Sequence, residues 1–296
     1  MRYITVEAAA KKWGLSARSV QIHCQKGNIV GVNLRGKSWM IPEGAERPRR
    51  KPRAKGRPNS ILAALKAEKR GQVKGALYHR LQIDFTYNSN HMEGSRLTHE
   101  QTRWIFETMT VGKLAADIPV DDIIETSNHF RCIDRIIDIA NDKLSEPIIK
   151  ELHLMLKAGT SDSQREWFRV GEYKILPNEV GGMETCAPEW VASEMRALLK
   201  SYNCKKRHTL EDIIDFHQRF ESIHPFQDGN GRVGRLIMLK ECLANRITPF
   251  IITEELKQFY YRGLVQWDSV PEYLLHTCRS AQDDFRALLA YFRIKE

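Results

Sequence analysis

Long hydrophobic runs are missing from this sequence of 296 residues, and their absence excludes one class of protein. A membrane-spanning helix needs about 20 consecutive apolar residues, and no segment approaches that length. The first residues also lack the apolar core of a secretion signal. We therefore expect a cytoplasmic protein without membrane contacts. Because 42% of the residues are hydrophobic, the chain can form a packed core, so general disorder is excluded as well.

Closely paired cysteines are also missing. None of the six cysteines forms a Cys-x-x-Cys pair, and their spacing suggests no metal cluster. The six are Cys24, Cys132, Cys186, Cys204, Cys242 and Cys278. Without an export signal we expect them to be reduced thiols, most of them structural.

Acidic residues are scarce in the first fifth of the chain. Residues 1–60 hold 14 Lys and Arg against 3 Asp and Glu, whereas the other 236 residues hold 32 against 34. The formal net charge of +9 therefore comes entirely from the first segment. A basic segment attached to a nearly neutral body is typical of a polyanion-binding arm.

Residues 1–43 form a compact pattern that residues 44–60 separate from the rest. Thr5 and Ser16 are predicted to cap two short helices, and Gly14 to end the first. Residues 29–41 are typical of a hairpin that turns at Arg35-Gly36-Lys37. Prolines and seven basic residues make residues 44–60 a linker. The pattern predicts a winged helix-turn-helix domain over residues 1–43.

This first segment resembles the excisionase/MerR-like family of small DNA-binding domains. The resemblance rests on residues 5–9, 14–16, 18–20, 26–29 and 39–42. It implies a recognition helix near residues 17–25 and DNA binding through residues 1–58. The implied DNA contacts are Arg18, Gln21 and Gln25 on the helix, with Arg35 and Lys37 on the wing. A small protein-binding module with a solvated basic face is the alternative.

Residues 61–296 are predicted to be mostly helical. Apolar residues recur at three- and four-residue spacing behind Thr209, with Asp212 three residues further on, and a second periodic segment runs from Arg232 to Ala244. Residues 172–184 break this pattern. There residues 173–176 and 180–183, on either side of Pro177-Asn178-Glu179, predict a short hairpin.

The segment 224–235, His-Pro-Phe-Gln-Asp-Gly-Asn-Gly-Arg-Val-Gly-Arg, concentrates the chemistry of phosphate transfer. A glycine-rich turn that leads into a helix N-terminus binds anions. Arg232 and Arg235 lie three residues apart, so they can share a face and contact phosphate oxygens. Asp228 offers a hard oxygen ligand to Mg²⁺. His224 at the loop entrance can accept a hydroxyl proton. This set suits attack of a hydroxyl on a phosphate.

The same segment resembles the Fic family signature, H-P-F-x-[DE]-G-N-G-R-x-x-R, at every position. The resemblance extends over roughly residues 62–290 and implies a mainly α-helical Fic domain. It implies that His224 is the general base and that Asp228 holds Mg²⁺. The implied contacts of the ATP phosphates and nucleotide in this segment are Asp228, Gly229, Asn230, Gly231, Arg232, Val233, Gly234 and Arg235.

Two further parts of the nucleotide site follow from this resemblance. The hairpin at 172–184 is similar to the family's flap, which aligns a target protein by strand pairing. Its residues expected near the nucleotide are Asn178, Glu179, Val180 and Gly181. Downstream, Tyr260 and Tyr261 resemble the aromatic pair that borders the adenine pocket, with Asp268 a further candidate.

Residues 89–94, Ser-Asn-His-Met-Glu-Gly, resemble the family's inhibitory motif, [ST]-x-x-x-E-[GN]. Ser89 and Glu93 share a helix face, and Gly94 is a natural helix stop. The position upstream of the signature is similar to class II of the family, with an inhibitory helix over about residues 77–94. The resemblance implies that Glu93 pairs with Arg235 and withholds it from the γ-phosphate.

Together these patterns predict a protein adenylyltransferase that moves AMP from Mg-ATP to a Ser, Thr or Tyr hydroxyl. The target would be another protein or the enzyme itself. Removal of AMP, or another nucleotidyl or phosphoryl transfer at the same site, stays open as an alternative. A third hypothesis is a DNA-binding regulator whose Fic domain senses nucleotide. A homodimer suits both kinds of module, although no residue indicates it.

Overall fold

The computed structural model describes residues 2–36, 38–48, 60–112 and 117–295. Its contacts divide the chain into two units, Met1–Gly56 and Arg57–Glu296, and each is described here by itself. Lys37 and residues 49–59, most of the predicted linker, lie outside the described residues. Within the described residues, no helix is long and apolar enough to cross a membrane.

The first unit packs two short helices against a small sheet. Helix α1 spans Val6–Trp13 and α2 spans Ala17–Gln25; Thr5 and Ser16 cap them, and Gly14 ends α1 with φ 63°. The strands β1 (Tyr3–Thr5), β2 (Asn33–Arg35) and β3 (Ser38–Pro42) form an antiparallel sheet in the order β1-β3-β2. The core side chains are Val6, Ala9, Ala10, Trp13, Val20, Cys24, Ile29 and Ile41.

This sheet differs from the predicted hairpin in two ways. The first hairpin strand begins at Asn33 rather than at Ile29, whose side chain is buried in the core instead. A third strand, β1, pairs with the far edge of β3, with Ile4 opposite Ile41. Three residues are too few for a period-two pattern, so β1 could not be predicted from local sequence.

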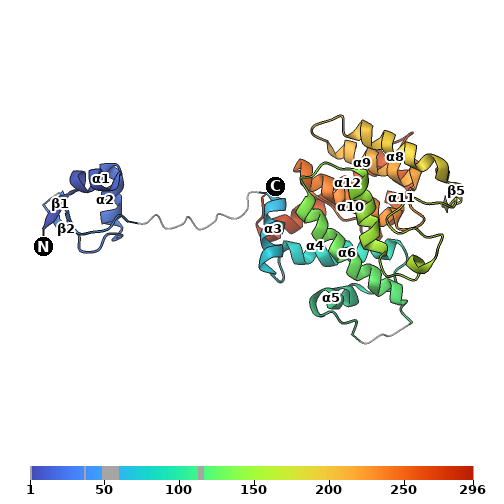
Figure 1. The fold of residues 1–296 in the computed structure, drawn as a ribbon, viewed down its shortest axis with the longest axis horizontal. Coiled ribbons are helices and arrows are strands. Elements are labelled where there is room, and N and C mark those ends of the chain that lie inside the picture. The colour runs from blue at the N-terminus through green and yellow to red at the C-terminus, as the bar shows by residue number, and fades with distance from the viewer. Residues whose placement is uncertain (1, 37, 49–59, 113–116, 296) are drawn as a thin grey trace. The chain divides into compact units, whose positions relative to one another are not determined.

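The larger unit is helical, as predicted, with one small hairpin (Figure 1). Its first five helices are α3 (Ile61–Gly71), α4 (Leu77–Met92), α5 (His99–Thr108), α6 (Val120–Ile139) and α7 (Glu146–Lys157). The next five are α8 (Pro188–Tyr202), α9 (Leu210–Ile223), α10 (Asn230–Asn245), α11 (Lys257–Val265) and α12 (Glu272–Phe292). Two 3₁₀ turns, Asp162–Gln164 and Glu254–Leu256, complete it.

Helix α10 lies at the centre of this unit, in contact with α4, α6, α7 and α9 (Figure 1). Its residues from Arg232 to Leu243 are all buried, charged ones included. A helix that is buried on every side belongs to the interior of a domain. Helix α10 is therefore held in place by these four neighbours. The loop 224–229 therefore joins two rigid elements, α9 and α10.

Side-chain caps explain where several helices begin. Thr98 with Gln101 and Thr209 with Asp212 each form a reciprocal capping box at the start of α5 and α9. Helix α10 begins at Asn230, two residues before the predicted start, and ends in Arg246 with φ 58°. The earlier start matters because it moves the helix N-terminus into the glycine-rich loop.

The prediction of the flap strands was wrong in register. The hairpin consists of β4 (Glu179–Val180) and β5 (Met183–Glu184), which turn at Gly181-Gly182. Both glycines have positive φ, 58° and 78°, as a tight hairpin turn requires. Residues 173–176 form no strand, because the amides of Lys174 and Leu176 bond the loop 224–229 instead, at Pro225 O (2.9 Å) and Gln227 Oε1 (3.3 Å).

Candidate active site

His224 stands where α9 ends. Its backbone has φ 50° and ψ 62°, the left-handed region, and its amide bonds the carbonyl of Phe220 at 2.9 Å. A non-glycine residue in this region is strained, and such strain clusters at functional sites. The turn directs the chain into Pro225 and the glycine-rich loop.

The environment of His224 keeps its ring neutral. Burial, together with the nearby positive charge of Lys174, lowers the pKa of His224 to about 4. At neutral pH the imidazole therefore carries one free lone pair. A neutral, partly buried histidine at the edge of a phosphate-sized loop can accept a proton from a hydroxyl group.

Asn230 closes the loop. Its Oδ1 accepts from the amide of Phe226, and its Nδ2 donates to the carbonyl of the same residue, both at 2.8 Å. The side chain is 1% exposed, so it is committed to the loop backbone. The backbone of Gly229 and Gly231, at the start of α10, is the part of this turn that suits an anion.

His153 supports the loop from below, and the sequence carried no signal for it. Its ring stacks on Phe226 with centroids 4.0 Å apart and an interplanar angle of 5°. Its Nδ1 accepts from the Gly171 amide at 2.8 Å, which leaves Nε2 to donate to the Asp228 carbonyl at 3.1 Å. Burial lowers the pKa of His153 to about 3, so this neutral form is stable.

Arg235 meets the carboxylate of Glu93, as the inhibitory motif predicts. The Nη2 atom of Arg235 lies 2.6 Å from Glu93 Oε1, and Arg235 also donates to Ser89 Oγ and Ser89 O, each at 3.0 Å. Although burial opposes its charge, the cations of Arg235 and Arg232 lower the pKa of Glu93. Gly94, with φ 92°, turns the chain away after α4.

Glu93 fills the anion cradle at the start of α10. A Cβ atom on Gly231 would lie only 2.3 Å from Glu93 Oε1. The carboxylate thus lies directly against the backbone of the glycine that opens the cradle. The protein's own anion occupies the place where helix geometry favours a phosphate.

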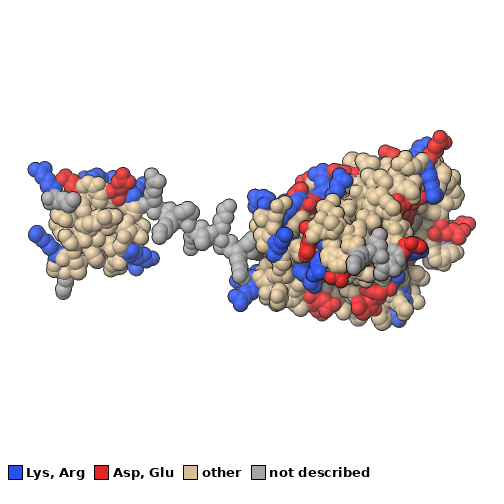
Figure 2. Space-filling model, turned by 90° about the horizontal axis from the view of Figure 1, so that it is seen from below, with Lys and Arg blue, Asp and Glu red and all other residues tan. Residues whose placement is uncertain are grey.

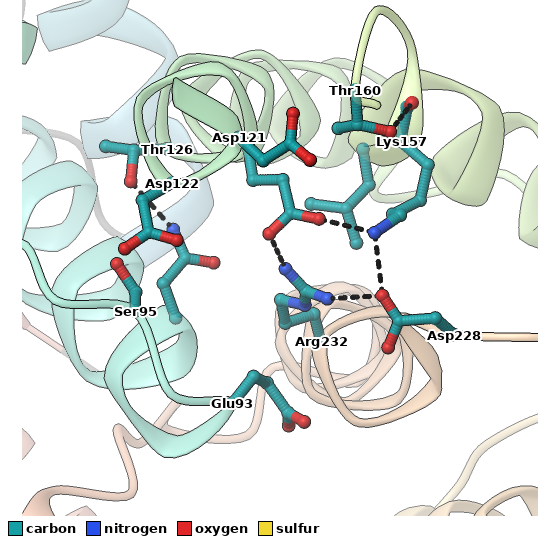
Figure 3. Close-up of polar contacts among 12 residues, drawn as sticks. Glu93, Ser95, Asp121, Asp122, Thr126, Lys157, Thr160, Asp228 and Arg232 are labelled. Atoms are coloured by element: carbon teal, nitrogen blue, oxygen red, sulfur yellow. Dashed lines mark hydrogen bonds and ion pairs between the residues drawn. The ribbon is translucent and has the colours of Figure 1, made fainter. Parts of the chain in front are cut away.

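Asp228 and Arg232 belong to a closed ring of alternating charges with Lys157 and Glu125. Figure 3 shows the carboxylate of Asp228 in contact with both Lys157 and Arg232. Lys157 Nζ lies 2.6 Å from Asp228 Oδ2 and 2.5 Å from Glu125 Oε1. Arg232 binds the other oxygen of Glu125 and lies 3.1 Å from Asp228 Oδ2. Neither Lys157 nor Glu125 was predicted, because single charged residues on α7 and α6 resemble ordinary surface positions.

The residues present suit one magnesium ion. Burial opposes ionisation, but the charges of Arg232 and Lys157 hold the pKa of Asp228 well below its usual range. Its side chain is 45% exposed, so the carboxylate can be reached from the cradle side. One carboxylate together with substrate phosphates is a common way for proteins to hold Mg²⁺.

The base of the flap is tied to the loop. Lys174 Nζ, 4% exposed as a residue, donates to Asn178 Oδ1 and Thr185 Oγ1, each at 2.6 Å, and to Ile223 O at 3.4 Å. Asn178 Nδ2 donates to Phe226 O at 3.0 Å. Asn178 therefore anchors the flap, whereas the predicted contacts Glu179, Val180 and Gly181 are exposed beyond it.

The downstream candidates lie in three different places. Tyr260 is buried; its hydroxyl bonds His217 Nε2 at 2.5 Å and also lies next to Arg235. Tyr261 is 38% exposed, and Glu93 and Arg235 act on its hydroxyl, so it stays at the site. Asp268 lines a hollow with Thr209 and Asp212 at the start of α9, about 20 Å along this helix from His224. The structure does not bring Asp268 to the loop.

Val233 and Gly234 serve packing. Val233 is fully buried in the main core. A Cβ atom on Gly234 would lie 2.5 Å from Glu221 Oε1 and 2.7 Å from the His217 ring, so only glycine lets α9 and α10 approach this closely.

In the first unit, the predicted DNA contacts that the structure describes are exposed to solvent. Arg18, Gln21 and Gln25 of α2 are exposed, and so is Arg35 on β2. Lys37 lies outside the described residues. Figure 2 shows Lys and Arg on several sides of this unit and both signs of charge mixed over the larger one.

Comparison with known proteins identifies the larger unit. Residues 143–242 match the model of the Fic/DOC family. This range includes the segment 224–235. A Fic domain-containing signalling protein of Bacteroides thetaiotaomicron has the same fold, with a TM-score of 0.61 and 25% identity over 77% of this chain and 94% of that protein. Residues 143–242 are therefore similar to the Fic/DOC family, and the larger unit shares the fold of that solved Fic domain-containing protein.

Two curated relatives carry the name protein adenylyltransferase. The Fic protein of Nematostella vectensis is 30% identical over 190 residues, and fic-1 of Caenorhabditis elegans is 24% identical over 184 residues. Each alignment covers 61% of this chain. The chain spans only 42% and 35% of the lengths of these two relatives.

Proposed function

We propose that the Fic domain transfers AMP from ATP to a hydroxyl group of a protein. The observation that carries this proposal is the loop 224–229, which places a neutral His224 beside an anion cradle at the start of α10. The names of the curated relatives support the same reaction class. The flap, anchored by Lys174 and Asn178, offers an exposed strand edge to a target segment.

The reaction is a displacement at the α-phosphorus. The target hydroxyl gives its proton to His224, and its oxygen forms a bond to the α-phosphorus. The bond between this phosphorus and the oxygen that bridges to the β-phosphate breaks, so pyrophosphate leaves. Bound Mg²⁺, held by Asp228 and the phosphates, would neutralise charge on the phosphate oxygens. Arg232 and Arg235 would hold the leaving group.

We propose further that Glu93 inhibits this reaction. Its carboxylate pairs with Arg235 at 2.6 Å and lies against Gly231, where a terminal phosphate needs both the arginine and the backbone. Ser89 adds two bonds to the same guanidinium, so Arg235 is held at three points. ATP can then bind only with its γ-phosphate displaced.

Labelled ATP tests both proposals. With label at the α-phosphate, Glu93→Gly should gain protein-bound label at least about tenfold over wild type, since removal of Glu93 frees a charge-assisted contact. Glu93→Gly/His224→Ala should lose this label.

Label at the γ-phosphate serves as the control and should stay free. Attachment of γ-label would indicate a kinase instead. Absence of α-label from the protein and from added lysate would favour AMP removal.

We also propose that the first unit binds DNA. The observation that favours this role is the exposed row of Arg18, Gln21 and Gln25 on α2, the second helix of a helix–turn–helix arrangement beside a β-wing. The excess of basic residues over residues 1–60 would attract phosphates. Transfer of AMP and binding of DNA are separate proposals, because they rest on separate units.

A further inference from the structure

Lys157 is a charged residue whose side chain is buried. It is the last residue of α7, and its side chain is only 3% exposed. Thr160 Oγ1 donates to its carbonyl at 2.8 Å, and Asn128 Nδ2 donates to the carbonyls on either side, Leu156 at 3.0 Å and Ala158 at 2.8 Å. The backbone at Lys157 is therefore fixed, and only its side chain can reposition.

Three carboxylates surround the ammonium group. Lys157 Nζ lies 2.5 Å from Glu125, 2.6 Å from Asp228 and 3.4 Å from Asp162. A buried cation needs such partners, because removal from water costs several kcal/mol per ion. One carboxylate is enough to neutralise one ammonium group. Because three surround Lys157, its ammonium can lose one of these contacts and still be paired.

Lys157 contacts the carboxylate of Asp228, to which a metal ion would bind. A divalent cation prefers a carboxylate oxygen that has no competing cation. Here Oδ2 of Asp228 is held by Lys157 and Arg232 together. A metal ion at this oxygen would stand within a few ångströms of the ammonium, and two positive charges at that distance repel strongly in a partly buried site.

The other two acids allow Lys157 to leave Asp228 without losing its pairing. Glu125 and Asp162 come from other elements than the loop, α6 and the 3₁₀ turn after α7. Glu125 is also the second partner of Arg232, so it keeps both cations paired when Asp228 turns to another ligand.

We propose that Lys157 is an internal counter-ion that holds Asp228 until a divalent cation displaces it, with Glu125 and Asp162 receiving the ammonium. The charge of Lys157 then sets how much metal the site requires. The contact between Lys157 and Asp228 is separate from that of Glu93, which pairs with Arg235 and lies in the anion cradle. It rests on the proposed function only in that Asp228 is the metal carboxylate.

Direct metal binding tests this proposal without any transfer reaction. Mn²⁺ is titrated into nucleotide-free protein, and the free ion is followed by electron paramagnetic resonance. Lys157→Met should bind Mn²⁺ at least about tenfold more tightly than wild type, because one positive charge beside the carboxylates is gone. Asp228→Asn added to Lys157→Met should remove that gain. Equal or weaker binding in Lys157→Met, or a gain that survives Asp228→Asn, would overturn the proposal.

Control variants separate charge from packing. Lys157→Arg keeps the charge and should bind Mn²⁺ as wild type does. Lys150→Met removes another ion-paired lysine of α7, bound to Glu146 and Glu172, and should change nothing. If Lys157→Met does not fold, Lys157→Gln retains a polar tip and should show the same gain. A protein that gains Mn²⁺ affinity but never carries labelled AMP would keep this proposal and refute the proposed function.

Discussion

Three imidazoles around the loop and Arg235 show the chemistry of this domain at the scale of single residues. Burial lowers the pKa to about 4 for His224 and to about 3 for His153 and His217. The three rings do different work. His224 faces the cradle, His153 supports the loop through Phe226, and His217 bonds Tyr260 beneath Arg235. All three must stay neutral for these contacts to persist.

This neutrality predicts a loss of stability in mild acid. In the unfolded chain each histidine takes up a proton near pH 6.5, whereas in the folded domain it does so only near pH 3 to 4. The unfolded state therefore binds more protons below pH 6.5, and stability falls as the pH falls. At pH 5 each histidine costs about 2 kcal/mol. Calorimetry between pH 7.5 and pH 5 should record a steadily falling Tm.

Two variants check the origin of this effect. His217→Gln should make the fall in Tm with pH less steep, because one buried histidine with a lowered pKa no longer titrates. His276→Gln, which changes an exposed histidine of α12, should leave it unchanged. A Tm that stays constant from pH 7.5 to pH 5 would contradict the assignment of neutral, buried rings.

At the scale of elements, the flap and the loop behave as one piece. The side chain of Lys174 joins the flap residues Asn178 and Thr185 to Ile223, whose carbonyl ends α9. A cation suits the negative end of a helix dipole. Among the described residues, no carboxylate oxygen lies within 4.0 Å of this ammonium, and burial lowers the pKa of Lys174 to about 8.

Removal of this cation should loosen the flap. In Lys174→Met, Asn178 and Thr185 lose their shared donor, so the hairpin should open locally at lower cost. Hydrogen exchange followed by mass spectrometry should show the amides of residues 175–185 exchanging at least about tenfold faster than in wild type, the amount expected when one charge-assisted bond is lost.

Lys174→Arg is the matched variant, since it keeps a cation with several donors. It should protect residues 175–185 better than Lys174→Met does. If the two variants and wild type exchange at the same rate, the hairpin is held by its own strand pairing, and Lys174 has no part in its anchoring.

At the scale of the whole molecule, two units of different charge share one chain. The acids and bases of the larger unit nearly balance, whereas the basic excess belongs to the first 60 residues. The two proposed functions can therefore be tested in the full-length protein by changes confined to one unit.

Binding of DNA should depend on the exposed face of α2. Replacement of Arg18, Gln21 and Gln25 by Ala should weaken binding to a DNA duplex at least about tenfold in a mobility-shift assay at 100 mM NaCl, because base and phosphate contacts are lost together. Wild-type affinity should fall linearly on a logarithmic scale as salt rises.

Lys11→Ala, on the exposed side of α1, is the control for loss of one charge at a distance from α2. It should weaken binding only slightly. A wild-type protein that does not shift DNA even at 50 mM NaCl would leave the alternative, a protein-binding module.

The sequence by itself determined the parts of this protein that local chemistry dictates. Caps at Thr98 and Thr209 and the stop at Gly14 follow from hydrogen bonds within a few residues, so the helices could be predicted. The order of residues 224–235 predicts a base, a carboxylate and an anion cradle, because a glycine-rich loop before a helix brings such residues together. The glutamate of residues 89–94 was also visible, since its spacing from Ser89 is local.

Tertiary structure decided everything that depends on partners distant in sequence. The flap turns at Gly181-Gly182 rather than at residues 177–179, because the preceding segment bonds the loop 224–229. Lys157 and Glu125 carry no local signal, and only the packing of α6 and α7 against α10 closes them into a ring with Asp228 and Arg232. Asp268 lies away from the loop for the same reason: its place along the chain was known, but the neighbours that it meets were set by packing alone.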